Sequence, residues 1–194
     1  MAIENGKGGE IGSSNKYSKF KAKMTGSLPV VLRVAILLAT GGATLGMGLN
    51  KQSKTAVVAV VGTTPISQTF VAQFQDTPAF VYFVIANAIA SFYNLLVLVL
   101  QPHLKGKAHN IWVLIFDMVV MTVVATGAAA AASIAELGKN GNQHARWNPI
   151  CDNFGAFCCR GAIALAESFV GSLLLLILNV LSTVTLRKNV AAHD

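Results

Sequence analysis

Long apolar stretches separated by polar segments dominate this chain. Four of them, at residues 30–49, 79–100, 111–135 and 161–186, are each long enough to cross a bilayer core, which takes about 20 residues of α-helix. Helices of a soluble bundle usually carry a polar face, and these stretches carry few polar residues. The pattern therefore predicts an all-α membrane protein, built as a bundle of four transmembrane helices.

The first of the two long connections, residues 50–78, has a β-type pattern. Residues 54–62 are rich in β-branched side chains and too short to span a membrane. Residues 63–67 resemble a turn, and residues 67–74 partly alternate apolar and polar positions. We therefore predict a small hairpin or sheet here. The second long connection, residues 136–160, contains all three cysteines of the chain.

The ends of the chain are polar. Residues 1–28 are Gly- and Ser-rich with a run of lysines, which predicts a disordered basic tail, and residues 189–194 form a short second tail. Of the Lys and Arg residues outside the spans, nine lie in residues 1–28, 101–110 and 187–194, and five lie in the two long connections. Because such charge marks the cytoplasmic side, we expect both termini in the cytoplasm and both long connections outside the cell. The four-span domain then covers residues 29–188.

The composition changes this picture little. The chain is 54% hydrophobic and 12% charged, whereas roughly a quarter of a soluble domain is charged. Its net charge of +7 would fit a nucleic-acid-binding protein. The basic residues, however, sit in tails and loops and are not interleaved with aromatic residues on one face. Membrane lipid is therefore the expected contact, and no nucleic acid is expected.

Two charged side chains lie inside the predicted spans at similar depths. Counted from the same side at 1.5 Å per residue, Arg33 lies roughly 6 Å inside the first span and Asp117 roughly 9 Å inside the third. A charge in the membrane is costly unless it is paired, so we predict an intramembrane ion pair. The alternative is that Arg33 extends to the membrane surface.

Further polar residues mark the second and fourth spans. Asn87, Ser91 and Asn94 share one helical face, and Glu167 lies near the outer leaflet with no base at matching depth. Hydrogen bonds between helices are one interpretation, and a polar pathway is the other. Glu167 is either protonated and hydrogen-bonded or lines a wet cavity.

Small residues recur on two spans. Gly42 and Gly46 have the GxxxG spacing, and Gly127, Ala131 and Ala135 repeat every fourth residue. Both patterns allow another helix to approach closely. Packing within one protomer and oligomerisation are both consistent with them.

The cysteines of the second long connection favour a disulfide, because an extracellular loop lies in an oxidising compartment. The pair Cys151–Cys158 is our first expectation and Cys151–Cys159 the alternative. The third thiol is either buried or paired between chains. The chain has no CxxC, HExxH, GxSxG or phosphate-binding glycine loop, so we expect no catalytic residue, metal or cofactor.

These features together resemble the Casparian strip membrane domain proteins and the CASP-like proteins, four-span relatives of the MARVEL proteins. The resemblance covers residues 29–188. Phe154 belongs to one of the similar segments, residues 147–159. The positions that match the family's motif are Arg33, Asp117, Trp147, Cys151 and Cys158.

The resemblance implies a non-enzymatic plasma-membrane scaffold. Such a protein self-assembles, alone or with related family members, and recruits secreted wall-modifying enzymes. Residues 62–80 lack the segment rich in Leu, Pro and Phe that the Casparian strip members carry, which favours the CASP-like branch and its first group. The alternative function is an oligomeric channel or small transporter that uses the polar face and Glu167.

Overall fold

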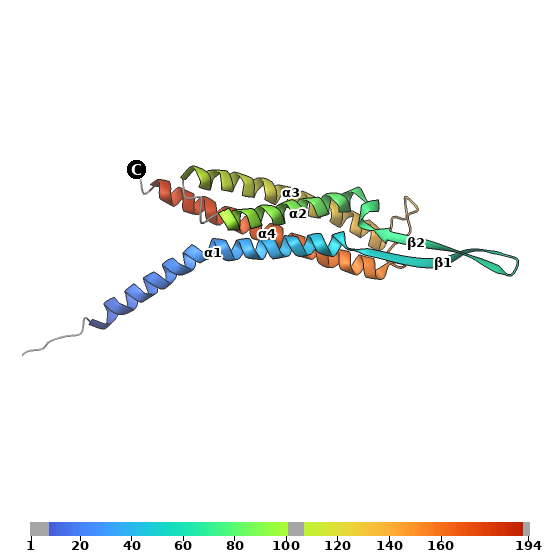
Figure 1. Cartoon of the computed structure of the whole chain (residues 1–194), viewed down its shortest axis with the longest axis horizontal. Coiled ribbons are helices and arrows are strands. Elements are labelled where there is room, and N and C mark those ends of the chain that lie inside the picture. Colours follow the sequence, from blue (N-terminus) through green and yellow to red (C-terminus); the bar gives the residue numbers. More distant parts are fainter. Residues whose placement is uncertain (1–7, 101–106, 192–194) are drawn as a thin grey trace, which may run out of the picture.

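Each apolar stretch of the sequence forms one helix of an elongated bundle (Figure 1). The computed structural model describes residues 8–100 and 107–191. The parts of the predicted tails at residues 1–7 and 192–194 lie outside this range. The elements follow one another as α1 (Gly8–Gly48), β1 (Lys51–Val61), β2 (Thr64–Gln73), η1 (Phe74–Asp76), α2 (Pro78–Leu100), α3 (Lys107–Asn140) and α4 (Gly155–Ala191).

Four helices are long and apolar enough to cross a membrane, at Ser27–Gly48, Pro78–Leu100, Ile111–Asn140 and Gly155–Lys188. The third and fourth extend beyond the stretches that the sequence predicted, because the helical backbone continues into more polar residues. The predicted fold class, a four-helix membrane bundle with a small β element, is confirmed.

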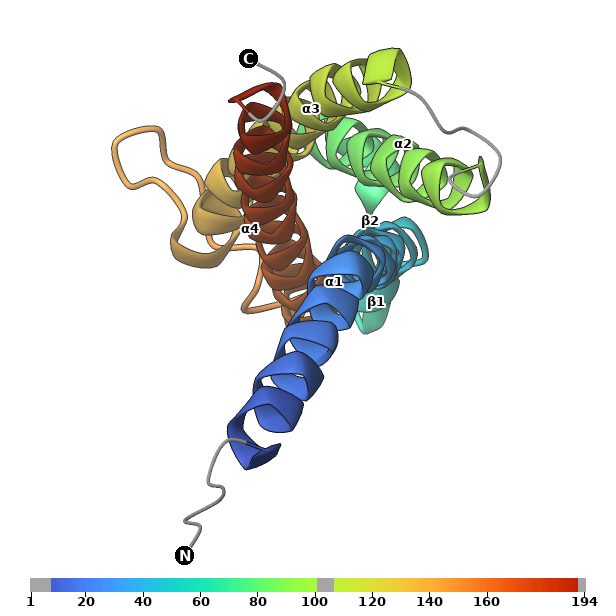
Figure 2. The same cartoon turned by 90° about the vertical axis from the view of Figure 1, so that its left-hand side faces the viewer.

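The four helices form a ring in which each packs against two neighbours (Figure 2). Helix α1 contacts α2 and α4, and α3 contacts the same two helices, so α1 and α3 occupy opposite corners. The interior holds two apolar clusters. The cluster nearer the hairpin is centred on Met47, Phe80, Phe83, Phe157 and Leu165. The other contains Ile36, Ala90, Val120, Val124, Leu175 and Leu178.

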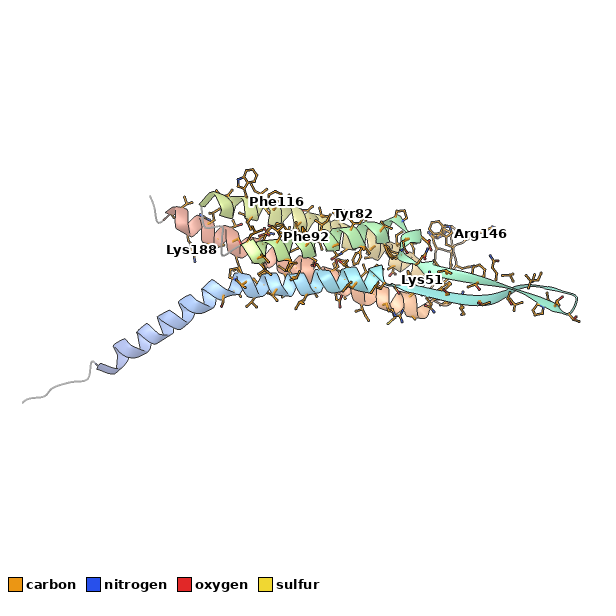
Figure 3. The ribbon with its side chains drawn as sticks, viewed as in Figure 1. Lys51, Tyr82, Phe92, Phe116, Arg146 and Lys188 are labelled. Atoms are coloured by element: carbon orange, nitrogen blue, oxygen red, sulfur yellow. A yellow bond between two sulfur atoms is a disulfide. The ribbon has the colours of Figure 1, made fainter. Side chains whose placement is uncertain are left out.

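The outer face of the bundle is also apolar. Phe92 of α2 and Phe116 of α3, labelled in Figure 3, are exposed, as are Leu38 of α1 and Leu173 of α4. In water so much exposed apolar surface would be unfavourable, whereas lipid chains solvate it without cost. The exposed surface therefore supports the interpretation of these helices as membrane spans.

Strands β1 and β2 form an antiparallel hairpin that projects beyond the helices (Figure 1). We call this end of the molecule the hairpin end. The chain reverses at Gly62, whose φ of +63° suits the first central residue of a tight hairpin turn. The turn is formed by residues 62–63, so it overlaps the predicted turn at 63–67 only at Thr63, and Pro65 lies in β2 opposite Val60. Val58 forms a bulge between two paired positions of β1.

The first helix also differs from prediction. Helix α1 begins at Gly8, so residues 8–28, predicted to be disordered, are helical. Residues 16–24 contain Lys, Ala and Met and no Gly or Pro, so the span can continue as helix toward the N-terminus. Pro29 lies inside α1. A proline there removes one backbone hydrogen bond and bends the helix, and the start of α1 turns away from the bundle (Figure 1).

Candidate functional site

The centre of the bundle contains an ion pair between its opposite corners. Nη1 and Nη2 of Arg33, on α1, donate to Oδ1 and Oδ2 of Asp117, on α3, at 3.0 and 2.6 Å. Arg33 is 5% exposed and Asp117 is fully buried. Nη1 of Arg33 also donates to Oδ1 of Asn94, on α2, at 3.2 Å. One guanidinium therefore connects three helices, and it does not extend to the membrane surface.

This geometry suits a charge pair in a medium of low dielectric. The two parallel N–H···O contacts satisfy both carboxylate oxygens and fix the relative rotation of α1 and α3. Desolvation offsets much of the Coulomb attraction, so the pair adds little net stability. We expect its main effect to be on specificity, since any other rotation of either helix would leave a buried charge unpaired.

A second polar contact lies about 10 Å away along α2, at 1.5 Å per residue. Oγ of Ser168, on α4, donates to Oδ1 of Asn87 at 2.9 Å, and both residues are fully buried. The amide nitrogens of Asn87 and Asn94 donate to the carbonyls of Phe83 and Ala90, one turn earlier. Both asparagines of the predicted polar face are thus hydrogen-bonded within the protomer.

The other two polar residues singled out in the spans lie against glycines of α1. A Cβ atom at Gly41 would lie 3.4 Å from Oγ of Ser91, and one at Gly42 would lie 2.7 Å from Oε2 of Glu167. Glu167 is half-buried, and among residues 8–100 and 107–191 its carboxylate has no hydrogen-bond partner. The carboxylate is accommodated because Gly42 has no side chain.

The small residues form contacts inside the bundle. A Cβ atom at Gly46 would lie 3.4 Å from Cβ of Ala164 on α4, and one at Gly127 would lie 3.2 Å from Cβ of Ala86 on α2. Ala131 is fully buried in the cluster near the hairpin, and Ala135 packs against its edge. Both predicted small-residue faces therefore serve packing within this protomer.

The loop between α3 and α4 is held by the predicted disulfide. Cys151 and Cys158 are bonded, with their Cα atoms 5.7 Å apart, and Cys159 is free and exposed. Phe154 packs against the apolar cluster near the hairpin. The backbone of Trp147 pairs with Asn142, while its side chain is 61% exposed.

The first turn of α4 is held by two residues that sequence analysis missed. Asn50 is 1% exposed and donates from Nδ2 to the carbonyl of Phe157 at 2.8 Å. Gln52 accepts from the backbone N–H of Phe157 at 2.8 Å, which satisfies a donor at the start of α4. Polar residues just after a span show no periodic pattern, so only their position next to the apolar stretch could have drawn attention to them.

Within the described residues, no three His, Cys, Asp or Glu side chains are grouped so that they could hold a metal ion. Five fully or nearly fully buried polar residues of the spans contact one another or backbone carbonyls: Arg33, Asn87, Asn94, Asp117 and Ser168. The large exposed features are the hairpin and the disulfide-bonded loop, both at the hairpin end.

Comparison with known proteins agrees with this description. The family model for the Casparian strip membrane protein domain matches residues 22–174. CASP-like protein 1B2 of Oryza sativa subsp. indica is 56% identical over 183 residues, which cover 94% of this chain and 93% of that protein. CASP-like protein 1B1 of Sorghum bicolor is 58% identical over 170 residues, covering 87% of this chain and 81% of that protein.

A more distant relative matches along nearly the whole chain. CASP-like protein 1B2 of Populus trichocarpa is 46% identical over 190 residues, which cover 96% of this chain and 94% of that protein. No solved structure matches the chain. The family model reaches from α1 into α4 and includes both long connections, and these relatives match over most of their length. The chain belongs to the Casparian strip membrane protein domain family.

Proposed function

We propose that this protein is a non-enzymatic scaffold of the plasma membrane, which self-assembles into a membrane domain and recruits wall-modifying proteins. The observation that carries this proposal is the β1–β2 hairpin. It extends beyond the bundle (Figure 1) and has no third strand in the described structure. Several of its apolar side chains are exposed. A surface of this kind suits contact with other proteins better than it suits chemistry on a small molecule.

The hairpin has two properties of a docking element. Val57 and Val60 are 58% and 64% exposed, and Ile66 is exposed on the facing strand. The outer edges of β1 and β2 carry backbone donors and acceptors that a further strand could pair with. Since an isolated two-stranded hairpin is only marginally stable in water, a partner that covers these residues would stabilise it.

The interior packing supports assembly through the hairpin rather than through the glycines. Gly46 and Gly127 already contact Ala164 and Ala86 within the protomer. They are therefore not free to form a helix–helix contact with a second copy. Self-association is left to the apolar outer face and to the exposed elements at the hairpin end.

The charge distribution supports an orientation. Lys and Arg outside the spans concentrate in the terminal segments and in the connection between the second and third spans, which favours the cytoplasm for that side. The hairpin and the disulfide-bonded loop then face the cell wall. The disulfide fits this orientation, because such bonds persist in an oxidising compartment.

The alternative function, a channel or transporter, has less support. A polar pathway needs side chains that face a common opening. Asn87 instead bonds to Ser168, and Asn94 bonds to Arg33, at two separate levels of the bundle. Glu167 packs against Gly42. An enzyme is disfavoured as well, since the family is not a known enzyme family and the sequence contains no catalytic motif.

Photobleaching recovery of a fluorescent fusion in a plant plasma membrane tests self-assembly. We expect little recovery over minutes and confinement to patches. A variant in which Val57, Val60 and Ile66 are each changed to Thr keeps β-branched side chains but loses apolar surface, and it should recover faster. The matched control changes Thr55 and Thr69 to Ser, which keeps their 3.0 Å hydroxyl contact in the same hairpin.

Recruitment needs a separate measurement. A secreted peroxidase with a fluorescent tag should concentrate over patches of the wild-type protein and less over the hairpin variant. Fast and complete recovery of the wild-type fusion after bleaching would overturn the scaffold proposal. Patches that form normally without concentrating any wall-modifying protein would overturn recruitment alone.

A further inference from the structure

A large apolar cavity lies at the hairpin end of the bundle. Its volume is about 810 Å³, and its walls come from the end of α1, β2, η1, the start of α2, the end of α3, the start of α4 and the disulfide-bonded loop. The walls include Met47, Val71, Phe80, Ala135, Phe154 and Leu165. The polar residues of the bundle centre, Arg33, Asp117 and Asn87, do not line it. The cavity is thus separate from the ion pair and its hydrogen bonds.

The cavity is partly open, so molecules around the bundle can enter it. An apolar molecule that does so removes the mainly hydrocarbon walls from contact with water. Water would fill it poorly, because an ordered water molecule needs two to four polar partners and these walls are mainly hydrocarbon. The walls therefore favour an apolar occupant.

The position of the cavity identifies the occupant. Met47, Phe80 and Leu165 belong to the spans Ser27–Gly48, Pro78–Leu100 and Gly155–Lys188, close to the end of each that lies toward the hairpin. With these segments in a membrane, lipid is the abundant apolar molecule beside this end of the bundle. We propose that the cavity binds the hydrocarbon part of a membrane lipid whose head group carries no net charge.

The charged residues at the rim of the cavity support the proposal that the head group carries no net charge. Among the residues that line the cavity, Asp76, Glu136 and Lys139 are charged, and they lie on η1 and the last turns of α3. Two acids and one base give a negative excess, which disfavours an anionic head group. They offer acceptors and a donor to a hydroxyl or a zwitterionic group. Glu136 itself accepts a hydrogen bond from Asn140.

The disulfide gives this cavity a fixed wall. Cys151 and Cys158 both line it, and their bond ties the loop to the first turn of α4. The backbone N–H groups of Ile150 and Cys151 donate to the carbonyl of Gly138, at 2.8 and 3.1 Å, which joins the same loop to α3. A wall fixed in advance lowers the ordering cost of binding.

Photocrosslinking of the purified full-length protein in lipid nanodiscs tests the proposal. The probes are a diazirine-bearing sterol and a phosphatidylcholine with the diazirine in its acyl chain, and mass spectrometry locates the labelled peptides. We expect label on residues 132–139 and 154–165. Label from the sterol alone, from the phospholipid alone or from both supports a hydrocarbon ligand and tells its source.

Two alanine-to-tryptophan variants, one turn apart on α4, provide the matched comparison. Ala162 lines the cavity and Ala166, one turn later, does not, although both are exposed. We expect Ala162→Trp to reduce labelling of these peptides by about tenfold, because it fills the site, and Ala166→Trp to leave it unchanged. Equal labelling of Ala162→Trp and wild type would overturn the proposal.

Two further measurements need only the wild-type protein. An excess of the unlabelled lipid should abolish labelling of the cavity peptides, and persistent labelling would count against a defined site even if Ala162→Trp failed to fold. A phosphatidylglycerol probe should label about fivefold less than the phosphatidylcholine probe because of the acidic rim. Equal labelling by both phospholipids would overturn the head-group part.

Discussion

Nη2 of Arg33 lies 2.6 Å from Oδ2 of Asp117, and this contact joins two helices at opposite corners of the bundle. Neighbouring helices of such a ring can slide while still burying apolar surface. A contact across the diagonal cannot form unless α2 and α4 hold α1 and α3 at the right depth and rotation. The pair is therefore sensitive to the arrangement of the whole bundle.

Removal of one member of the Arg33–Asp117 pair should strongly lower the stability of the fold. Asp117→Ala leaves the Arg33 guanidinium buried without a carboxylate, and we expect a loss of about 3–5 kcal/mol of stability. Thermal unfolding of the detergent-solubilised protein and the fraction that reaches the cell surface measure this effect. A double variant, Arg33→Met with Asp117→Leu, removes both charges and should restore most of the stability. Normal unfolding and surface delivery of Asp117→Ala would contradict the assigned role.

The close approach of α2 and α3 at Gly127 leads to a second prediction. A Cβ atom there would lie 3.2 Å from Cβ of Ala86, which is tighter than an ordinary contact, and the Cβ of Ala86 cannot yield without a backbone shift. Gly127→Val should therefore cost about 1–3 kcal/mol. Gly138→Val is the control on the same helix, because a Cβ there meets nothing within 4 Å. Equal midpoints of thermal unfolding for the two variants would argue against tight packing at Gly127.

Much of the fold was predictable from the sequence, because hydropathy is a local property. Each span is an uninterrupted apolar run, and the depths of Arg33 and Asp117 follow from counting residues along two such runs. The pattern did not show that the two residues lie on diagonal helices. The order of helices around the ring depends on packing between segments that are far apart in the sequence.

The contacts of Asn50 and Gln52 could not be predicted from the sequence. Both residues bond to the backbone of Phe157, more than a hundred positions away. Nothing around Asn50 distinguishes it from an ordinary loop residue, and its burial results from the way β1 leaves α1 beside α4. The sequence also could not decide whether Cys158 or Cys159 pairs with Cys151. The structure decides it, because the start of α4 turns Cys158 toward the loop and Cys159 outward.

The disulfide should contribute measurably to stability. A crosslink that closes so short a loop is worth about 2–3 kcal/mol in the chain-entropy estimate, so Cys151→Ser with Cys158→Ser should lower the midpoint of thermal unfolding. A reducing agent should lower the midpoint of the wild type in the same way and leave the double variant unchanged. Cys159→Ser serves as the control and should shift stability by no more than about 0.5 kcal/mol, since Cys159 is free and exposed.

Substitution of Glu167 distinguishes the scaffold function from the channel function. Asn87 and Asn94 are engaged at two levels of the interior, so these two amides do not form a continuous row of free polar groups for an ion to follow. We therefore expect proteoliposomes with wild-type protein and with Glu167→Gln to show the same conductance as protein-free liposomes. A conductance that the wild type produces and Glu167→Gln alters would reverse the ranking of the two functions. Because Glu167→Gln keeps the shape of the side chain beside Gly42, packing should be preserved, and a change in conductance would report charge rather than misfolding.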